Sequence, residues 1–416
     1  LVLALALGLF LFWAYTQHSG LGISPDSVAY LSTAEHLLSG KGGVDFSGQA
    51  LVLFPLGYPF FLALVLGLLP FATPSILLWT NALLWASYLV GLRKILHEIF
   101  PAAWLVRYSV LLVAATSPAL LEVFTMVWSE TLFLWVTQLF LWAAYQHGKA
   151  SPSRWQNLWF WVMTVCAAAG LFTRFAGLSL VITGVVFLWR WRNQWLSFLV
   201  LAFLPLGLNL LRNHWAAQQL AGVRQMANQS IWDKATEMGV VVQSWFPLSD
   251  ISPLALGLGG LVLAVLVLVT SLLAAPRPAV SFKLYWAVYT LFLFALSSIS
   301  RFEPLSNRLL VPAFVPLLIL LAMALVKIWE GAKAKGYKWL KPLLVLGMGV
   351  WVLRLGVHQY QTQSAVLEGV WYAGIPGYTE DMWRGSALWQ FLGSHPLKKE
   401  KTVYTNSHEA YYMGTR

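Results

Sequence analysis

The chain has 416 residues, of which 59% are hydrophobic and only 10% are charged. Soluble globular domains carry roughly 25% charged residues, so this composition excludes that class and indicates an integral membrane protein. The formal net charge of +11 does not indicate nucleic-acid binding, because much of it follows the pattern that sets membrane topology. The single cysteine, Cys166, excludes a disulfide framework and a cysteine metal site.

Repeated apolar runs predict transmembrane helices, because barrel strands would alternate apolar and polar residues. We expect about eleven crossings, each formed by a run long enough to span the bilayer or nearly so. The expected spans are Leu1–Tyr15, Ser75–Leu92, Trp104–Leu121, Leu132–Tyr145, Trp155–Phe172, Leu178–Leu188, Leu196–Leu211, Leu254–Leu273, Tyr285–Ile299, Leu309–Val326 and Leu340–Val357. Tyr58–Phe71 is too short to cross about 30 Å and is expected to be juxtamembrane or re-entrant.

The first apolar run starts at Leu1 without an initiator methionine. We therefore expect a short N-terminal segment to precede it, with a cleaved signal peptide as the alternative.

The first polar segment, Ser24–Pro59, contains an acid just beyond the first span. An acid at the membrane–water boundary is costly unless it is solvated or used. Ser24 and Asp26 are residue types that cap helix N-termini, and apolar residues then recur at helical spacing until a glycine-rich stretch. The pattern predicts an amphipathic helix in the membrane interface, with Asp26 at its N-terminus.

The distribution of charge predicts which loops share a face. If Asp26 is outside, the inner loops hold 14 of the 27 basic residues but only two of the 16 acids, Glu98 and Glu330. Short loops rich in Lys and Arg face the cytoplasm, which supports this orientation. We therefore expect a transmembrane bundle at 1–357, a first extracytoplasmic loop at 16–59, a large outer loop at 215–253 and an extracytoplasmic C-terminal segment at 358–416.

Two of these outer segments differ from ordinary connections. The outer loop at 215–253 is too long for a simple link between helices, so we expect a functional loop or lid. The C-terminal segment is too short for a large core of its own, so we expect it to pack on the outer face of the bundle.

Two outer acids are candidate catalytic residues. Asp26 begins the interfacial helix, and Glu130 begins a span within TMVWSETLFLW. Each would also be explained as a helix cap or as a partner of the helix dipole. Together they would supply a general base and an acid, or clamp a divalent cation between two carboxylates. A divalent cation is therefore a candidate cofactor.

Three outer arginines are candidate phosphate ligands. Arg301 and Arg308 lie in RFEPLSNRLLVP, just before a span. A guanidinium group pairs with two phosphate oxygens at once. Snorkelling to the interface is the alternative, but positive charge without a function is expected on the cytoplasmic side. Arg174, in GLFTRFAGL, either reaches the same phosphate or marks a short loop.

The sequence contains no Walker-type loop, HExxH motif or GxSxG elbow, so an ATP-driven pump is not indicated. A transporter or flippase of lipid-linked saccharides is the rival interpretation. Such proteins use sites near the membrane midplane, whereas the candidate residues here lie at one face.

The order and spacing of these segments resemble the polytopic GT-C glycosyltransferases of the family 39-like group, relatives of the protein O-mannosyltransferases and of the lipid A aminoarabinose transferase. The resemblance covers most of the chain. It rests on the first-loop acid and on AYLSTAEHLLSGKG, GYPFFLAL, SETLFLW, LFTRFAGL, NRLLVPAFVPLL and YTNSHEAYYMGTR.

The resemblance implies an all-α GT-C-like bundle that transfers a sugar from a polyprenyl-phosphate donor to a glycan, lipid or protein acceptor. It places the reaction at the periplasmic or exterior face of a bacterial inner membrane. The residues that it implies are Asp26 as general base, Glu130 as second acid, Arg308, Arg301 and Arg174 at the donor phosphate, and Tyr30 and Tyr58 as substrate-positioning groups.

Two departures from the family pattern leave the acceptor open. Ser27 follows Asp26 where the mannosyltransferases have a tandem Asp-Glu. Phe54–Leu56 stand where the aminoarabinose enzyme has a basic residue. A polymerase or ligase of lipid-linked glycans is therefore a close alternative.

Overall fold

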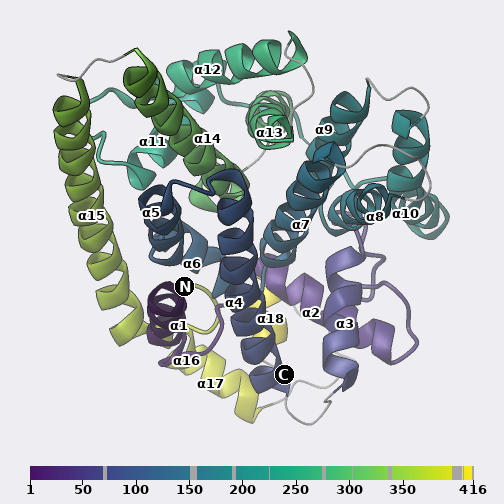
Figure 1. Cartoon of the computed structure of the whole chain (residues 1–416). Coiled ribbons are helices and arrows are strands. Elements are labelled where there is room, and N and C mark those ends of the chain that lie inside the picture. Colours follow the sequence, from purple (N-terminus) through teal and green to yellow (C-terminus); the bar gives the residue numbers. More distant parts are fainter. Residues whose placement is uncertain are drawn as a thin grey trace.

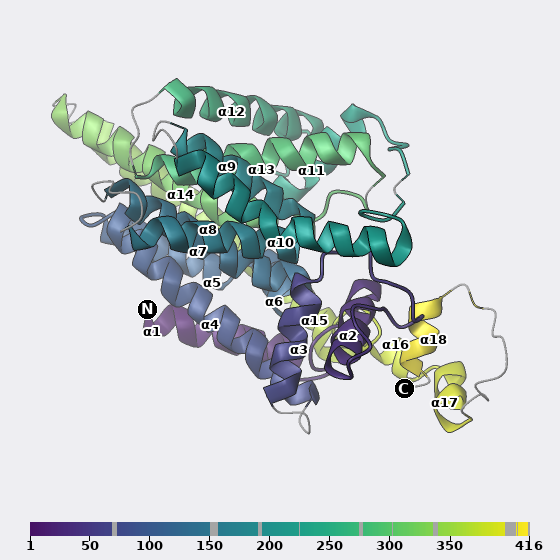
Figure 2. The ribbon, with the colours of Figure 1, turned by 90° about the vertical axis from the view of Figure 1, so that its right-hand side faces the viewer.

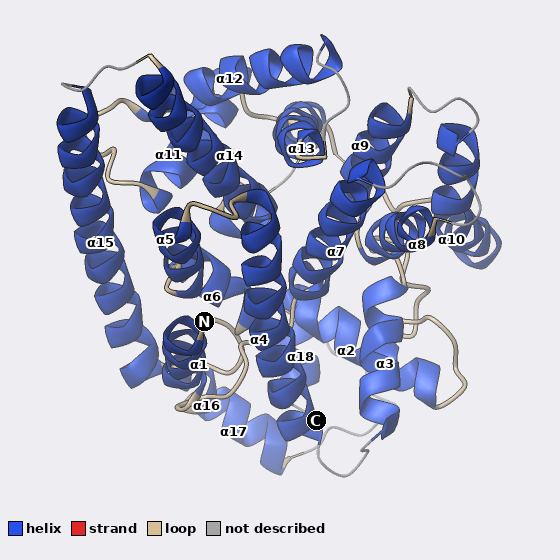
Figure 3. Ribbon diagram, in the orientation of Figure 1, coloured by secondary structure: helices blue, strands red, loops and turns tan. Residues whose placement is uncertain are grey.

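The computed structural model describes residues 1–68, 73–149, 157–189, 194–223, 225–273, 278–301, 303–335, 340–395, 405 and 407–414. Within these ranges every regular element is a helix (Figure 3), apart from three isolated β-bridges. The predicted all-α class is confirmed. Three residues of the predicted juxtamembrane piece, Leu69, Pro70 and Phe71, lie outside the described residues, as do Trp155 and Gln156 at the start of a predicted span.

The helices follow one another along the chain (Figure 1). They are α1 (Val2–Thr16), α2 (Pro25–Leu38), α3 (Gly57–Leu68), α4 (Thr73–Ile99), α5 (Trp104–Ala115), α6 (Pro118–Phe124), α7 (Ser129–Lys149), α8 (Leu158–Thr173), the 3₁₀ turn η2 (Phe175–Gly177), α9 (Leu178–Leu188), α10 (Gln194–Ala217), α11 (Ile231–Trp245), α12 (Pro253–Leu273), α13 (Val280–Ile299), α14 (Asn307–Ala334), α15 (Leu340–Ala373), α16 (Asp381–Arg384), α17 (Ala387–Ser394) and α18 (His408–Gly414).

Among the described residues, five helices are long and apolar enough to cross a membrane: α4, α10, α12, α13 and α14. The bent pair α5 and α6 makes a sixth if it is one span, and four further apolar helices have 10–17 residues. The protein is thus a polytopic membrane protein. The expected number of about eleven crossings stays a prediction, because the short helices fall below the roughly 20 residues that span the bilayer.

The long helices lie lengthwise beside one another, and α2, α16, α17 and α18 gather at one end of them (Figure 2). Backbone hydrogen bonds tie the C-terminal segment to the approach to α2. Tyr378 donates its N–H to the carbonyl of Ile23 at 2.7 Å, and Ile375 donates to Ser19 Oγ at 3.0 Å. The last helices therefore pack against the first polar segment of the chain.

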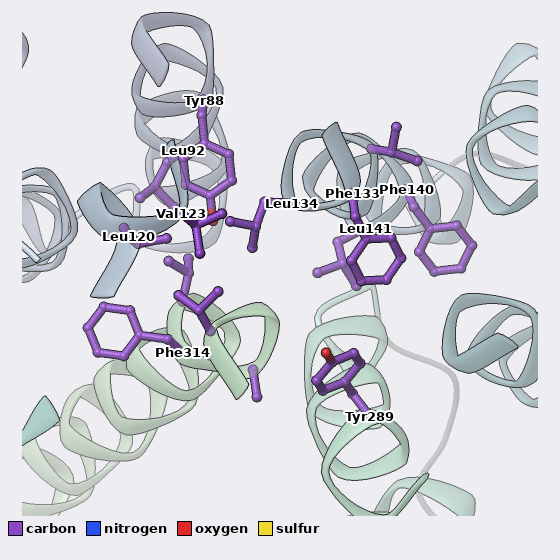
Figure 4. Close-up of a cluster of buried hydrophobic side chains, with 14 of the residues drawn as sticks. Tyr88, Leu92, Leu120, Val123, Phe133, Leu134, Phe140, Leu141, Tyr289 and Phe314 are labelled. Atoms are coloured by element: carbon purple, nitrogen blue, oxygen red, sulfur yellow. The ribbon is translucent and has the colours of Figure 1, made fainter. Parts of the chain in front are cut away.

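The core is apolar and aromatic where α4, α6, α7, α13 and α14 meet (Figure 4). Phe133 and Phe140 of α7 are completely buried, as is Leu120 of α6. By contrast α12 buries only Gly257 and Ala264. A helix that is apolar all round but exposed in the isolated chain is expected to face lipid.

The predicted span Trp104–Leu121 is bent in the structure. The chain bends there by 52° between α5 and α6. Ser117 caps α6 by accepting from the N–H of Leu120, and Pro118 occupies its first turn. Because proline cannot continue the helix before it, the apolar run is broken although its hydropathy is continuous.

The segment 215–253, predicted to be an outer loop, is not a loop throughout, because it contains α11. This helix begins with a capping box in which Ser230 and Asp233 exchange hydrogen bonds. It packs on α12 through two glycines: a Cβ on Gly239 would overlap the carbonyl oxygen of Pro253, and one on Gly257 would overlap that of Ala235. Small residues at such crossings let the backbones approach closely.

We predict that Gly257→Ala lowers the thermal unfolding midpoint of the detergent-purified protein, because overpacking a close contact costs about 1–3 kcal/mol. Gly260→Ala in the same helix is the control, since its Cβ would meet no atom within 4 Å. Alanine favours a helix over glycine by about 1 kcal/mol, so this control should unfold at the same or a higher temperature. Equal midpoints for the two variants would contradict the described crossing.

Candidate functional site

A short backbone pairing brings the starts of α2 and α7 together. Gly22 donates its N–H to the carbonyl of Thr125 at 2.9 Å, and Val127 donates to the carbonyl of Gly22 at 3.0 Å. Four residues beyond Gly22, Asp26 is the second residue of α2, and Glu130 is the second residue of α7. Acids are favourable in the first turn of a helix, where the dipole is positive. The pairing therefore sets two carboxylates side by side.

Arg308 joins the two carboxylates. It is the second residue of α14, and its Nε donates to Glu130 Oε1 at 2.5 Å while its Nη2 donates to Asp26 Oδ2. Arg174, the residue that ends α8, pairs with the same oxygen of Glu130 and donates to Ser129 Oγ at 3.0 Å. Four residues that the sequence proposed separately thus form one cluster, hereafter the Arg308 cluster: Asp26, Glu130, Arg174 and Arg308.

The four side chains differ in their access to solvent. The Glu130 side chain is 1% exposed, Arg308 is 11% exposed and Arg174 is 17% exposed. Asp26 is the most accessible at 22%. An incoming hydroxyl would therefore reach Asp26 before Glu130.

Trp128 packs against one face of the Arg308 guanidinium. The sequence did not indicate this residue as part of the site. The guanidinium carbon lies 4.4 Å from the centre of the indole ring, within the range of a cation–π contact. The indole Nε1 donates to Ser24 Oγ at 2.8 Å, which links it to the cap of α2. Tryptophan is common at membrane boundaries, so its presence in TMVWSET carried no specific signal.

Tyr30 and Tyr58 lie beside this cluster. The Tyr30 hydroxyl is 3.3 Å from Ser129 Oγ, and its ring meets that of Tyr58 edge to face at 5.2 Å. Burial raises the pKa of Tyr30 above its ordinary value, and the charges of Asp26 and Glu130 add to the effect. The hydroxyl is therefore neutral and able to donate a hydrogen bond.

Helix α11 positions the start of α14. Glu237 of α11 accepts the N–H of Leu305 at 2.8 Å. Asn307, the first residue of α14, accepts from Trp245 Nε1 at 2.9 Å and from Ser244 Oγ at 3.0 Å. These contacts fix the residue directly before Arg308. The predicted functional loop thus contains a helix that supports the site.

Arg301 is not brought into this cluster. Its Nη1 donates to the side-chain oxygen of Gln225 at 2.5 Å, and its backbone N–H donates to the carbonyl of the same residue at 2.8 Å. Its predicted contact with a phosphate stays a prediction.

The two carboxylates proposed as metal ligands are not arranged to bind a divalent cation. Asp26 and Glu130 are the proposed ligands, but the Arg308 guanidinium already lies against both carboxylates. A bound cation would have to displace it and would then face Arg174. Among the described residues, no group of three or more His, Cys, Asp or Glu side chains is placed to hold a metal. We therefore derive no chemical step through a metal ion.

No protein-family model matches the chain, and no curated protein matches it. Solved structures do match. Two crystal structures of ArnT from Cupriavidus metallidurans, one bound to undecaprenyl phosphate and one in the apo state, each align with a TM-score of 0.60. Each alignment covers 99% of this chain and 84% of that protein at 14% identity.

ArnT is a GT-C glycosyltransferase, the lipid A aminoarabinose transferase. The resemblance seen in the sequence is therefore confirmed at the level of the fold. At 14% identity, the match shows the fold and does not establish the activity.

We predict that Glu130→Gln strongly destabilises the protein, because it leaves two largely buried guanidinium groups with one fewer carboxylate. Breaking a buried ion pair from one side costs about 3–5 kcal/mol. Thermal unfolding in detergent, followed by tryptophan fluorescence, measures the change.

Glu303→Gln is the matched control. Glu303 also faces Arg308, but the two are 3.8 Å apart and its side chain is 64% exposed. Exposed pairs contribute about 0–1 kcal/mol, so this variant should unfold near the wild-type temperature. An equal shift in both variants would contradict a structural role specific to Glu130.

Proposed function

We propose that this protein is a membrane glycosyltransferase that moves a sugar from a polyprenyl-phosphate donor to an acceptor at the extracytoplasmic face. The observation that carries the proposal is the Arg308 cluster, which sets two guanidinium groups and an accessible carboxylate at one end of the helix bundle. The fold of ArnT supports it, since one structure of that protein is bound to undecaprenyl phosphate.

The arginines suit the phosphate of such a donor. Arg308 is held between carboxylates, and its Nη1 points toward the exposed Glu303, 3.8 Å away. A phosphate that approaches this edge would compete with Asp26 for the guanidinium. The starts of α2, α7 and α14 meet here, and helix N-termini favour an anion.

Asp26 is the proposed general base. The acceptor hydroxyl loses its proton to the Asp26 carboxylate and its oxygen forms a bond to the anomeric carbon. The bond from that carbon to the phosphate oxygen breaks, and the electron pair leaves with the polyprenyl phosphate. Arg308 and Arg174 stabilise the negative charge that accumulates there, an electrostatic role that is strong in a partly dry site.

Glu130 has a different proposed role. Its carboxylate is buried and contacts both guanidinium groups, so it holds them in place and does not meet the acceptor. Tyr30 and Tyr58 would line the same site as positioning groups.

A transporter or flippase of lipid-linked saccharides is the rival. Its substrate site would lie near the membrane midplane, on broken helices. In the Arg308 cluster, Asp26, Glu130 and Arg308 are instead the second residues of α2, α7 and α14. The charges therefore lie at helix ends.

We predict that membranes containing the wild-type protein transfer a labelled sugar from a synthetic polyprenyl-phosphate donor, and that Asp26→Asn lowers the rate about 10²–10⁴-fold. This is the contribution expected of a general base. Protein amounts are matched by immunoblot.

Asp45→Asn is the control for this assay. Asp45 lies in the same polar segment, but its carboxylate accepts from the N–H and hydroxyl of Ser47 within a turn. Its loss should leave the rate close to wild type. Equal transfer by wild type and Asp26→Asn would contradict a catalytic role and leave Asp26 as a helix cap. Absence of transfer with every donor tested would favour the transporter.

A single displacement at the anomeric carbon inverts its configuration. We therefore predict that NMR of the isolated product shows the anomeric configuration opposite to that of the donor. Retention of the donor's anomeric configuration would contradict a single displacement with Asp26 as the general base.

A further inference from the structure

A hollow lies where α4 ends and α5 begins. It measures about 120 Å³, well above the 10–15 Å³ that one water needs, and is lined by Arg93, Leu96, His97, Arg107, Tyr108 and Leu111.

This hollow is at the opposite end of the bundle from the Arg308 cluster. Helix α7 runs from Glu130 to Lys149, about 28 Å at 1.5 Å per residue. Lys149 pairs at 2.9 Å with Glu98, the residue after His97. The hollow and the cluster are therefore separated by roughly the thickness of a bilayer.

The polar groups of the hollow are hydrogen-bond donors. Arg107 Nη1 lies 2.5 Å from His97 Nδ1 and also donates to the carbonyl of Pro101 at 3.3 Å. Because a guanidinium only donates, Nδ1 of His97 accepts and its Nε2 carries the proton. Arg93, the remaining N–H groups of Arg107, His97 Nε2 and the Tyr108 hydroxyl are then all available as donors.

Among the described residues, no carboxylate forms an ion pair with Arg93 or Arg107. Glu98, the nearest acid along α4, is used by Lys149, by Gln146 at 2.5 Å and by Trp142 at 3.3 Å. Arg93 of α4 and Arg107 of α5 line one hollow from two helices.

One side of the hollow is apolar, aromatic and exposed. Trp104 and Tyr108 begin α5, are 57% and 46% exposed, and contact each other edge to face at 6.4 Å. Exposed aromatic rings of this kind mark the membrane–water interface. Leu105 beside them is also exposed, while Leu96 and Leu111 form a buried apolar floor.

We propose that this hollow binds the phosphodiester headgroup of an anionic phospholipid. Arg93 and Arg107 hold the phosphate, His97 and Tyr108 donate to its oxygens, and the acyl chains lie along the exposed apolar side of α5. Basic hollows between transmembrane helices are suited to such headgroups. The site is independent of the proposed transferase activity.

The test is native mass spectrometry of the full chain purified in detergent and titrated with phosphatidylglycerol or phosphatidylcholine. We expect wild type to retain phosphatidylglycerol in preference to phosphatidylcholine. Arg93→Gln with Arg107→Gln should bind phosphatidylglycerol roughly 30-fold more weakly, since each basic side chain at a membrane surface strengthens such binding roughly fivefold.

Lys327→Gln with Lys333→Gln is the charge-matched control. Both lysines are exposed on the later turns of α14 and line no part of the hollow. This variant should bind as wild type does. Arg93→Gln alone changes only an exposed side chain, so it keeps the test valid if the double variant folds poorly, and it should bind roughly fivefold more weakly.

Three outcomes would overturn the proposal. The first is equal binding by wild type and the arginine variants, and the second is equal retention of phosphatidylcholine. The third is displacement of phosphatidylglycerol by millimolar inorganic phosphate, which would assign the hollow to a free anion.

Discussion

The arrangement depends on one cation shared by two anions. Arg308 lies at the start of α14, where the helix dipole is unfavourable to positive charge, and it is only 11% exposed. Asp26 and Glu130, each at the start of a helix where an acid is favourable, compensate it. The ion pairs therefore hold together three helices whose N-termini would otherwise meet without a common partner.

The surrounding structure serves this contact. The backbone pairing at Gly22 aligns α2 with α7, and α11 fixes Asn307 beside Arg308. Trp128 closes one side of the guanidinium. The more exposed side is that of Asp26, where a lipid-linked phosphate and an acceptor would meet.

Much of this could be predicted from the sequence. Asp26, Glu130 and Arg308 each border a predicted apolar span, and Arg174 interrupts one. A charge at such a position is costly unless it is solvated or functional, so the sequence marks these residues as candidates. Their convergence on a single guanidinium could not be predicted, since it depends on how α2, α7 and α14 pack. The bend before Pro118 could not be predicted because the hydropathy of that run is continuous, and α11 could not because charged and polar residues interrupt its apolar ones.

The most direct test of the account is the affinity of the purified protein for a polyprenyl phosphate, measured for wild type and for Arg308→Lys. Lysine keeps the charge but loses the planar fork, so we predict binding weaker by roughly tenfold or more. Arg354→Gln is the control, because Arg354 is exposed and pairs with the exposed Asp250 at 3.4 Å, outside the Arg308 cluster. Unchanged affinity in Arg308→Lys would contradict a phosphate site at Arg308.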